Sequence, residues 1–181
     1  MEKIWEEIPQ IELIENQELR QKVKKCFEEA LKRSSFDEEQ ALNIPFTLLI
    51  PNCPVTLLQH TATVTDIAIA SAKAMIKQYP ELKINMDYLI AGAILHDVGK
   101  LLEYEYKGGE YKKSDFGKFV RHPISGAALA LELGLPKEVA HIIATHSHEG
   151  DRGYRSPEAV IVNKADFIAF DTLRSFLGLT K

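Results

Sequence analysis

The stretch Leu95-His96-Asp97-Val98-Gly99-Lys100 decides how the rest of the chain is interpreted. It follows the apolar run 89–95 (LIAGAIL), which is typical of the buried part of a helix. An aspartate at the end of such a run is costly to desolvate unless a partner stabilises it. A metal ion suits an adjacent histidine and aspartate, because it takes imidazole nitrogen and carboxylate oxygen as ligands. The remaining ligands must then come from other histidines and aspartates of the chain.

Length and composition indicate an ordinary globular protein. The 181 residues are 45% hydrophobic and 27% charged, so we expect a single domain over 1–181, with a helical extension over 1–44 and a core over 45–181. The formal net charge of −4 gives no sign of a nucleic-acid-binding surface. Cys26 and Cys53 form no disulfide framework and the acidic start has no secretory signal, so we expect a cytoplasmic protein. No apolar run approaches the about 20 residues needed to span a membrane.

Helical periodicity, with start and stop signals, predicts an all-α fold. Helices are expected over 16–34, 37–42, 54–79, 85–96, 114–120, 122–133, 136–145 and 156–177. Pro45, Pro51 and Pro54 break the chain, so 44–53 is expected to be a loop with an apolar underside. The exception to helix is 103–112 (EYEYKGGEYK), whose aromatic residues and Gly-Gly turn predict a β-hairpin.

Four of the six histidines fall on faces or ends of the expected helices that point inward. Two aspartates also point inward from such positions. The full set of inward residues is His60, His96, Asp97, His122, His146 and Asp166. His141 differs, because its helical neighbours Lys137 and Glu138 belong to a solvated face. Any inward histidine alone is more often a hydrogen-bonded core residue than a ligand, and Asp166 alone suits an ion pair equally well. A core role would have to be assumed separately for each member of the set, whereas one shared metal site accounts for all of them. The set as a whole therefore favours a metal site.

The order His, His-Asp, His, His, Asp resembles the HD-domain superfamily, an all-α fold of metal-dependent phosphohydrolases. The resemblance covers 56–171 and includes 96–100 (HDVGK), 121–127 (RHPISGA) and Ala165-Asp166. It implies a helical bundle with a small β-hairpin insertion. The run 156–166 (SPEAVIVNKAD) is also similar to the corresponding helix in the HD domain of ribonuclease Y. The coiled coil and nucleic-acid-binding modules of that enzyme are not found in this sequence, which argues against the same function.

The resemblance implies, by position, a dinuclear site. The ligands of a first divalent ion would be His60, His96, Asp97 and Asp166. A second ion would be held by a bridging Asp97 together with His122 and His146. Ligands without thiolate leave Mn, Fe, Co, Ni, Zn and Mg as candidates, and leave open whether one or two ions bind. A water activated by the metal would be the nucleophile that attacks phosphorus.

Lys100 lies one turn beyond the aspartate. The resemblance favours its contact with a substrate phosphate over a solvated lysine after a turn glycine. We therefore expect Asp97 and Lys100 to be catalytic, with Lys118 and Arg121 as further phosphate contacts. The expected substrate is a nucleotide or another small phosphate ester, and the sequence leaves a homo-oligomer open. Cyclic-di-GMP is not supported, because 146–149 (HSHE) is followed by Gly153-Tyr154-Arg155 and not by the Gly-Tyr-Pro signature of those phosphodiesterases.

Two alternatives to a phosphohydrolase or phosphodiesterase stay open. A mixed-valent di-iron oxygenase of the same superfamily would need the same six ligands, so the ligand set cannot separate the two activities. A non-catalytic nucleotide-sensing module could keep the fold without the chemistry. Retention of every ligand argues against the sensor, because a sensor needs no activated water.

Overall fold

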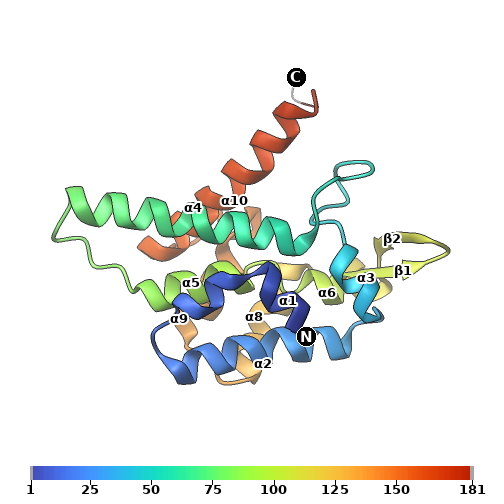
Figure 1. Cartoon of the computed structure of the whole chain (residues 1–181), viewed down its shortest axis with the longest axis horizontal. Helices are drawn as coiled ribbons and strands as arrows, with labels where there is room; N and C mark the ends of the chain where they lie inside the picture. The colour runs from blue at the N-terminus through green and yellow to red at the C-terminus, as the bar shows by residue number, and fades with distance from the viewer. Residues whose placement is uncertain (1, 180–181) are drawn as a thin grey trace.

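Helices account for nearly all the regular structure in the computed structural model, which describes residues 2–179 (Figure 1). In chain order the α-helices are α1 (Glu2–Glu7), α2 (Gln17–Arg33), α3 (Glu38–Asn43), α4 (Leu57–Gln78), α5 (Met86–Leu95), α6 (Lys100–Glu103), α7 (Asp115–Phe119), α8 (His122–Glu132), α9 (Lys137–Thr145) and α10 (Pro157–Phe176). Two 3-10 helices, η1 (Pro9–Leu13) and η2 (His148–Gly150), lie between them. The expected all-α fold is confirmed. None of the helices described is long and apolar enough to cross a membrane.

The predicted β-hairpin is present as β1 (Tyr104–Lys107) and β2 (Glu110–Lys113), which pair in an antiparallel register. Its two-residue turn holds Gly108 at φ 70° and Gly109 at φ 85°. Both angles lie in the left-handed region that glycine adopts without steric cost, which explains the Gly-Gly pair. The sequence did not predict α6, the single turn that joins the His-Asp pair to this hairpin.

Side-chain caps fix most helix starts where the sequence predicts them. The capping side chains that accept a backbone N–H in the first turn belong to Asn16, Asp37, Thr56, Asn85, Ser114 and Ser156. Helix α4 begins three residues later than the expected start at Pro54, because Pro45 forms an antiparallel bridge with Thr56. Thr56 and Gln59 then form a capping box, in which each side chain accepts from the other residue's backbone N–H.

Helix α5 is the central helix of the bundle. Every residue from Leu89 to Leu95 is buried, and α2, α4, α9 and α10 all pack against it. At Gly92 an added Cβ would lie 2.6 Å from Cγ2 of Ile142, so the close approach of α5 and α9 requires glycine. The C-terminal end of α5 carries His96 and Asp97, which places this pair in the middle of the molecule.

The segment before residue 45 contributes to the main hydrophobic core. Ile4, Ile8 and Ile11 are at most 1% exposed and belong to the same cluster as Ile90 and Ile94 of α5. Helix α2 lies along the outside of the bundle (Figure 1), but its apolar face is buried and includes Val23 and Phe27. Within this segment α2 and η1 pack against α5, while α1, η1 and α3 also contact α4.

Replacement of Phe27 tests this shared core. Phe27 is 2% exposed and packs edge-on against Trp5, with ring centroids 5.7 Å apart. Phe27→Ala should lower the free energy of unfolding by about 3–5 kcal/mol, since it leaves a cavity in the core. Urea denaturation followed by circular dichroism measures the change. Leu49→Ala, at a side chain that is 80% exposed, is the control and should stay within about 0.5 kcal/mol. Equal effects would show that the N-terminal segment does not share the core.

Candidate metal centre

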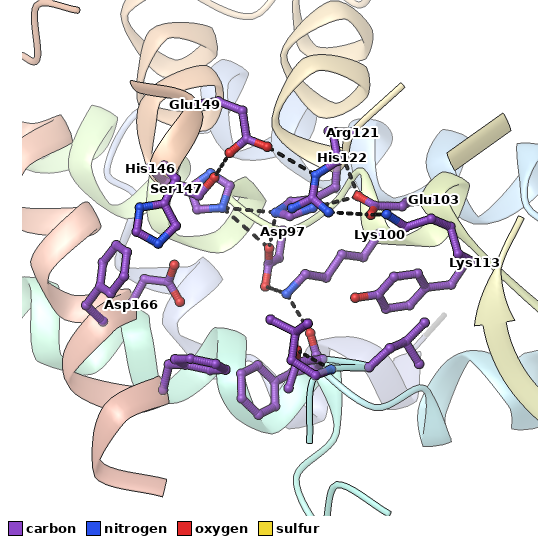
Figure 2. Close-up of a pocket in the computed structure, with 18 residues that line it drawn as sticks. Asp97, Lys100, Glu103, Lys113, Arg121, His122, His146, Ser147, Glu149 and Asp166 are labelled. Atoms are coloured by element: carbon purple, nitrogen blue, oxygen red, sulfur yellow. Dashed lines mark hydrogen bonds and ion pairs between the residues drawn. The ribbon is translucent and has the colours of Figure 1, made fainter. Parts of the chain in front are cut away.

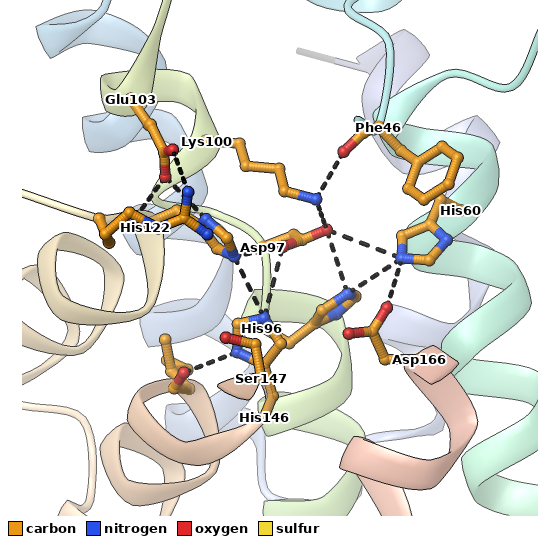
Figure 3. A network of polar contacts seen from close by, with 12 residues as sticks. Phe46, His60, His96, Asp97, Lys100, Glu103, His122, His146, Ser147 and Asp166 are labelled. Atoms are coloured by element: carbon orange, nitrogen blue, oxygen red, sulfur yellow. Dashed lines mark hydrogen bonds and ion pairs between the residues drawn. The ribbon is translucent and has the colours of Figure 1, made fainter. Parts of the chain in front are cut away.

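The six candidate ligands converge at the C-terminal end of α5 (Figure 3). They come from α4 (His60), from the end of α5 (His96, Asp97), from the first turn of α8 (His122), from the end of α9 (His146) and from α10 (Asp166). All except Asp166 are buried, and the Asp166 side chain is 18% exposed. Five helices that are distant in sequence therefore deliver one cluster of imidazole and carboxylate groups.

Asp97 lies between two groups of histidines and turns one oxygen toward each. Its Oδ2 lies 3.3 Å from Nε2 of His96 and 3.7 Å from Nε2 of His60. Its Oδ1 lies 3.2 Å from Nε2 of His122 and 3.5 Å from Nε2 of His146. Asp166 joins the first group, with Oδ1 3.0 Å from Nε2 of His60. The cluster thus consists of two sets of ligand atoms that share a single carboxylate.

Hydrogen bonds on the far side of three imidazole rings turn Nε2 toward the cluster. Nδ1 of His96 lies 2.6 Å from the carbonyl oxygen of Ala93, and Nδ1 of His146 lies 2.7 Å from that of Ile143. Because a carbonyl oxygen only accepts, each of these Nδ1 atoms must carry the proton. His122 makes the corresponding contact with a carboxylate. This arrangement is typical of histidines that bind metal through Nε2.

The lone pairs that meet at this point need a cation. Nε2 of His122 and Nε2 of His146 lie 3.3 Å apart and both face Oδ1 of Asp97. That oxygen is buried and has no hydrogen-bond partner among the described residues. Burial lowers the pKa of His122 to about 4, so this ring is neutral near pH 7. A divalent ion would satisfy all three atoms at once, so the residues present fit a metal.

Four members of the cluster, Asp97, His122, His146 and Asp166, line a cavity of about 250 Å³ (Figure 2). One part of the lining is charged and consists of Asp97, Lys100, Glu103, Lys113, Arg121, Glu149 and Asp166. Another part is apolar and consists of Phe46, Leu48, Leu49, Tyr104, Phe167 and Phe170. A ligand in this cavity could therefore contact His122 and His146 of the cluster and the apolar side chains at the same time.

Lys100 is buried and its ammonium lies inside this cavity. Its Nζ donates to Oδ2 of Asp97 at 2.6 Å and to the carbonyl oxygen of Phe46 at 2.5 Å. The alternative of a solvated lysine is therefore wrong. The Phe46 ring in turn stacks on His60, with centroids 4.2 Å apart, and holds that imidazole in place. Burial opposes ionisation of Asp97, but Lys100 and His96 hold the pKa of this carboxyl well below its usual range.

The other two expected phosphate contacts differ in position. Arg121 lines the cavity, where it donates to Glu103 and Glu149. Lys118 is exposed, pairs with Asp115 at 2.6 Å and is not among the residues that line the cavity. The structure instead brings Lys113 of the hairpin to the cavity.

Two functional neighbours of the ligands had no clear signal in the sequence. Glu103 is 1% exposed and contacts His122 from the end of α6, a helix too short to show periodicity. Asn163 is buried on α10, where Nδ2 donates to the carbonyl oxygen of His146 at 2.6 Å.

The prediction that His141 lies on a solvated face is wrong. His141 is half-buried, and its Nε2 accepts from the backbone N–H of Ser156 at 3.1 Å.

Comparisons with known proteins identify the family of this chain. The family model for the HD domain matches residues 57–171. The chain is 37% identical over 114 residues to a dihydroneopterin 2′,3′-cyclic phosphate phosphodiesterase of Methanocaldococcus jannaschii, covering 61% of this chain and 44% of the relative. It is 35% identical over 89 residues to ribonuclease Y of Acidothermus cellulolyticus, covering 49% of this chain and 15% of the relative. The chain thus spans less than half the length of these curated relatives. No solved structure matches it.

Replacement of the shared carboxylate tests the arrangement. Asp97→Asn keeps the side-chain volume but removes the charge that faces both groups of histidines, so we expect binding of both ions to be lost. Inductively coupled plasma mass spectrometry of the protein after equilibration with Mn²⁺ or Co²⁺ measures the metal content. Asp87→Asn is a matched control, because Asp87 accepts from the backbone N–H groups of Glu15 and Asn16 far from the site. Wild-type metal content in Asp97→Asn would contradict the shared-ligand arrangement.

Proposed function

The chain belongs to the HD-domain family, and from this premise we propose that it is a metal-dependent phosphodiesterase for a small cyclic phosphodiester that carries a ring system. The observation that carries the proposal is the single carboxylate of Asp97 between two sets of ligand atoms. His60, His96, Asp97 and Asp166 would hold one ion, and Asp97, His122 and His146 the other. Ions held there would supply Lewis acidity and lower the pKa of a bound water from about 15.7 toward about 7.

The charges around the cavity support a role for the metal in substrate binding. Three cationic side chains, Lys100, Lys113 and Arg121, line the cavity together with four carboxylates. Each of these cations already pairs with a carboxylate, as Lys100 does with Asp97 and Arg121 with Glu103. Without added cations the lining therefore has no excess positive charge to attract a phosphate. Metal ions would reverse this balance, so phosphate binding should depend on them.

The names of the relatives support cleavage of a phosphodiester. One relative is named for a 2′,3′-cyclic phosphate and the other is a ribonuclease, and both substrates contain a phosphorus atom with two ester bonds. A cavity of about 250 Å³ suits a small molecule better than a polynucleotide. The apolar lining, with Leu49, Phe167 and Phe170, suits a flat heterocycle attached to the phosphate. A pterin 2′,3′-cyclic phosphate is the first candidate. No observation favours the oxygenase or the sensor over this activity.

The residues of the chain would share the work of hydrolysis. Water adds to phosphorus, one ester P–O bond breaks, and the departing oxygen takes a proton, so that a cyclic diester becomes a monoester. Protonated Lys100 has no lone pair for a metal and acts only as a donor, as it does to Asp97 and to the carbonyl oxygen of Phe46. In the complex it would contact a phosphoryl oxygen as a point charge. The stacked ring of Phe46 would keep the imidazole of His60 in position.

A substrate panel tests the proposal directly. Metal-stripped protein supplied with Mn²⁺, Co²⁺ or Fe²⁺ should convert nucleoside and pterin 2′,3′-cyclic phosphates to monoesters, which ³¹P NMR distinguishes. Glycerol 1,2-cyclic phosphate is the matched comparison, because it has the same cyclic phosphate but no heterocycle to contact the apolar side chains. It should react more slowly. Addition of EDTA should abolish turnover. Metal-loaded protein that hydrolyses no phosphodiester in this panel would contradict the proposal.

Replacement of Lys100 separates phosphate contact from metal binding. Lys100→Ala should lower kcat by about 10² to 10³-fold, because one electrostatic contact with the transition state is lost. Metal content should be unchanged or higher, since no ammonium competes for Asp97. Lys100→Arg should recover little activity, because the forked guanidinium is larger than the ammonium that fits between Asp97 and Phe46. Wild-type kcat in Lys100→Ala, with metal bound, would show that Lys100 does not contact the substrate.

A further inference from the structure

A buried carboxylate outside the ligand set holds one of the ligands from behind. Glu103, at the end of α6, is 1% exposed. Its Oε2 accepts from Nδ1 of His122 at 2.7 Å and from the backbone N–H of His122 at 2.6 Å (Figure 3). One oxygen atom therefore fixes both the ring of His122 and the first turn of the helix that carries it.

The other oxygen of Glu103 is anchored from the rim of the cavity. Oε1 lies 3.1 Å from Nη1 of Arg121 and 3.2 Å from Nζ of Lys113 (Figure 2). Four donors therefore surround this carboxylate, two from His122 and one each from Arg121 and Lys113, and they hold it in this orientation.

This partner differs from those of the other two candidate ligand histidines whose Nδ1 makes a hydrogen bond. His96 and His146 donate Nδ1–H to a main-chain carbonyl of their own helix, three residues back. His122 donates to a carboxylate 19 residues away in sequence. A charged acceptor makes the imidazole a stronger donor to a metal than a neutral acceptor does. The group formed by Asp97, His122 and His146 lacks the second carboxylate that Asp166 gives to the other group. A charged partner behind His122 should therefore increase the metal affinity of this group more.

We propose that Glu103 is a positioning residue that selectively raises the affinity of the His122–His146 side of the centre for its metal ion. It acts through the ring of His122 and does not touch the ion. The inference rests on the ligand set given under the proposed function, but not on the reaction or its substrate. The His60–Asp166 side has no contact with Glu103 among the described residues, so its affinity should not depend on this carboxylate.

Titration of the substrate-free protein with Co²⁺ tests the proposal. Isothermal calorimetry and the visible bands of Co²⁺ should resolve two binding steps in the wild type. In Glu103→Gln, which keeps the side-chain volume, one step should weaken by about 10 to 100-fold, the usual cost of losing such a partner. The other step should be unchanged. Glu149→Gln is the matched control, because Glu149 lines the same cavity and binds the same Arg121 but does not contact His122. It removes an equal charge and should leave both steps nearly as in the wild type.

Several results would overturn the proposal. Equal weakening of both steps in Glu103→Gln would indicate a general loss of structure, and equal effects of Glu103→Gln and Glu149→Gln would indicate charge alone. If Glu103→Gln does not fold, ¹⁵N-histidine NMR of the Zn²⁺-loaded wild type decides the matter, since His122 should show a protected Nδ1–H and a metal-bound Nε2. The opposite tautomer would refute the role of Glu103. Because no substrate is present, a protein with two Co²⁺ steps and no hydrolysis would refute the proposed function alone.

Discussion

The structure depends on the burial of one negative charge at the end of its most apolar helix. Asp97 is 2% exposed, and an isolated carboxylate at such a position would cost several kcal/mol. The chain compensates by surrounding it with Lys100 and with imidazole nitrogens from four other positions. His60 and His146 belong to α4 and α9, which pack against α5, and His96 ends α5 itself. His122 belongs to α8, which packs on α9. The same packing of helices therefore builds the hydrophobic core and places the candidate ligands.

The inward direction of the candidate ligands was accessible from the sequence because helical phase is a local property. His60, His122 and Asp166 each fall on the apolar side of a helix whose start is marked by a cap or a proline, so their direction follows from spacing alone. The same logic failed for His141, because the backbone N–H that it binds belongs to Ser156 in another helix. Periodicity along one helix says which side is apolar, but not which polar group a neighbouring element brings to the other side.

The features that the sequence did not reveal all arise from contacts between distant segments. The burial of Lys100 depends on the carbonyl of Phe46, 54 residues earlier, in a loop whose path is set by prolines and an isolated bridge. The role of Glu103 depends on α6, whose single turn brings the carboxylate under the start of α8. The isoleucines of the first 14 residues likewise become core residues only through packing with distant segments such as α5. None of these contacts leaves a repeat or a motif that could be recognised beforehand.

The delivery of ligands from five helices has a consequence for the amount of folded protein. Ions bound as proposed would contact α4, α10 and the end of α5 at one group of ligands, and α8, the end of α9 and the end of α5 at the other. An unfolded chain could not assemble these contacts. Binding would then be linked to folding by mass action, contributing about 2.7 kcal/mol when the free ion is at 100 times its Kd. In a cell the supply of the metal would set how much of the chain survives proteolysis as well as how fast it works. Metal starvation would remove the protein itself, and restoring the ion to an already degraded pool would require new synthesis.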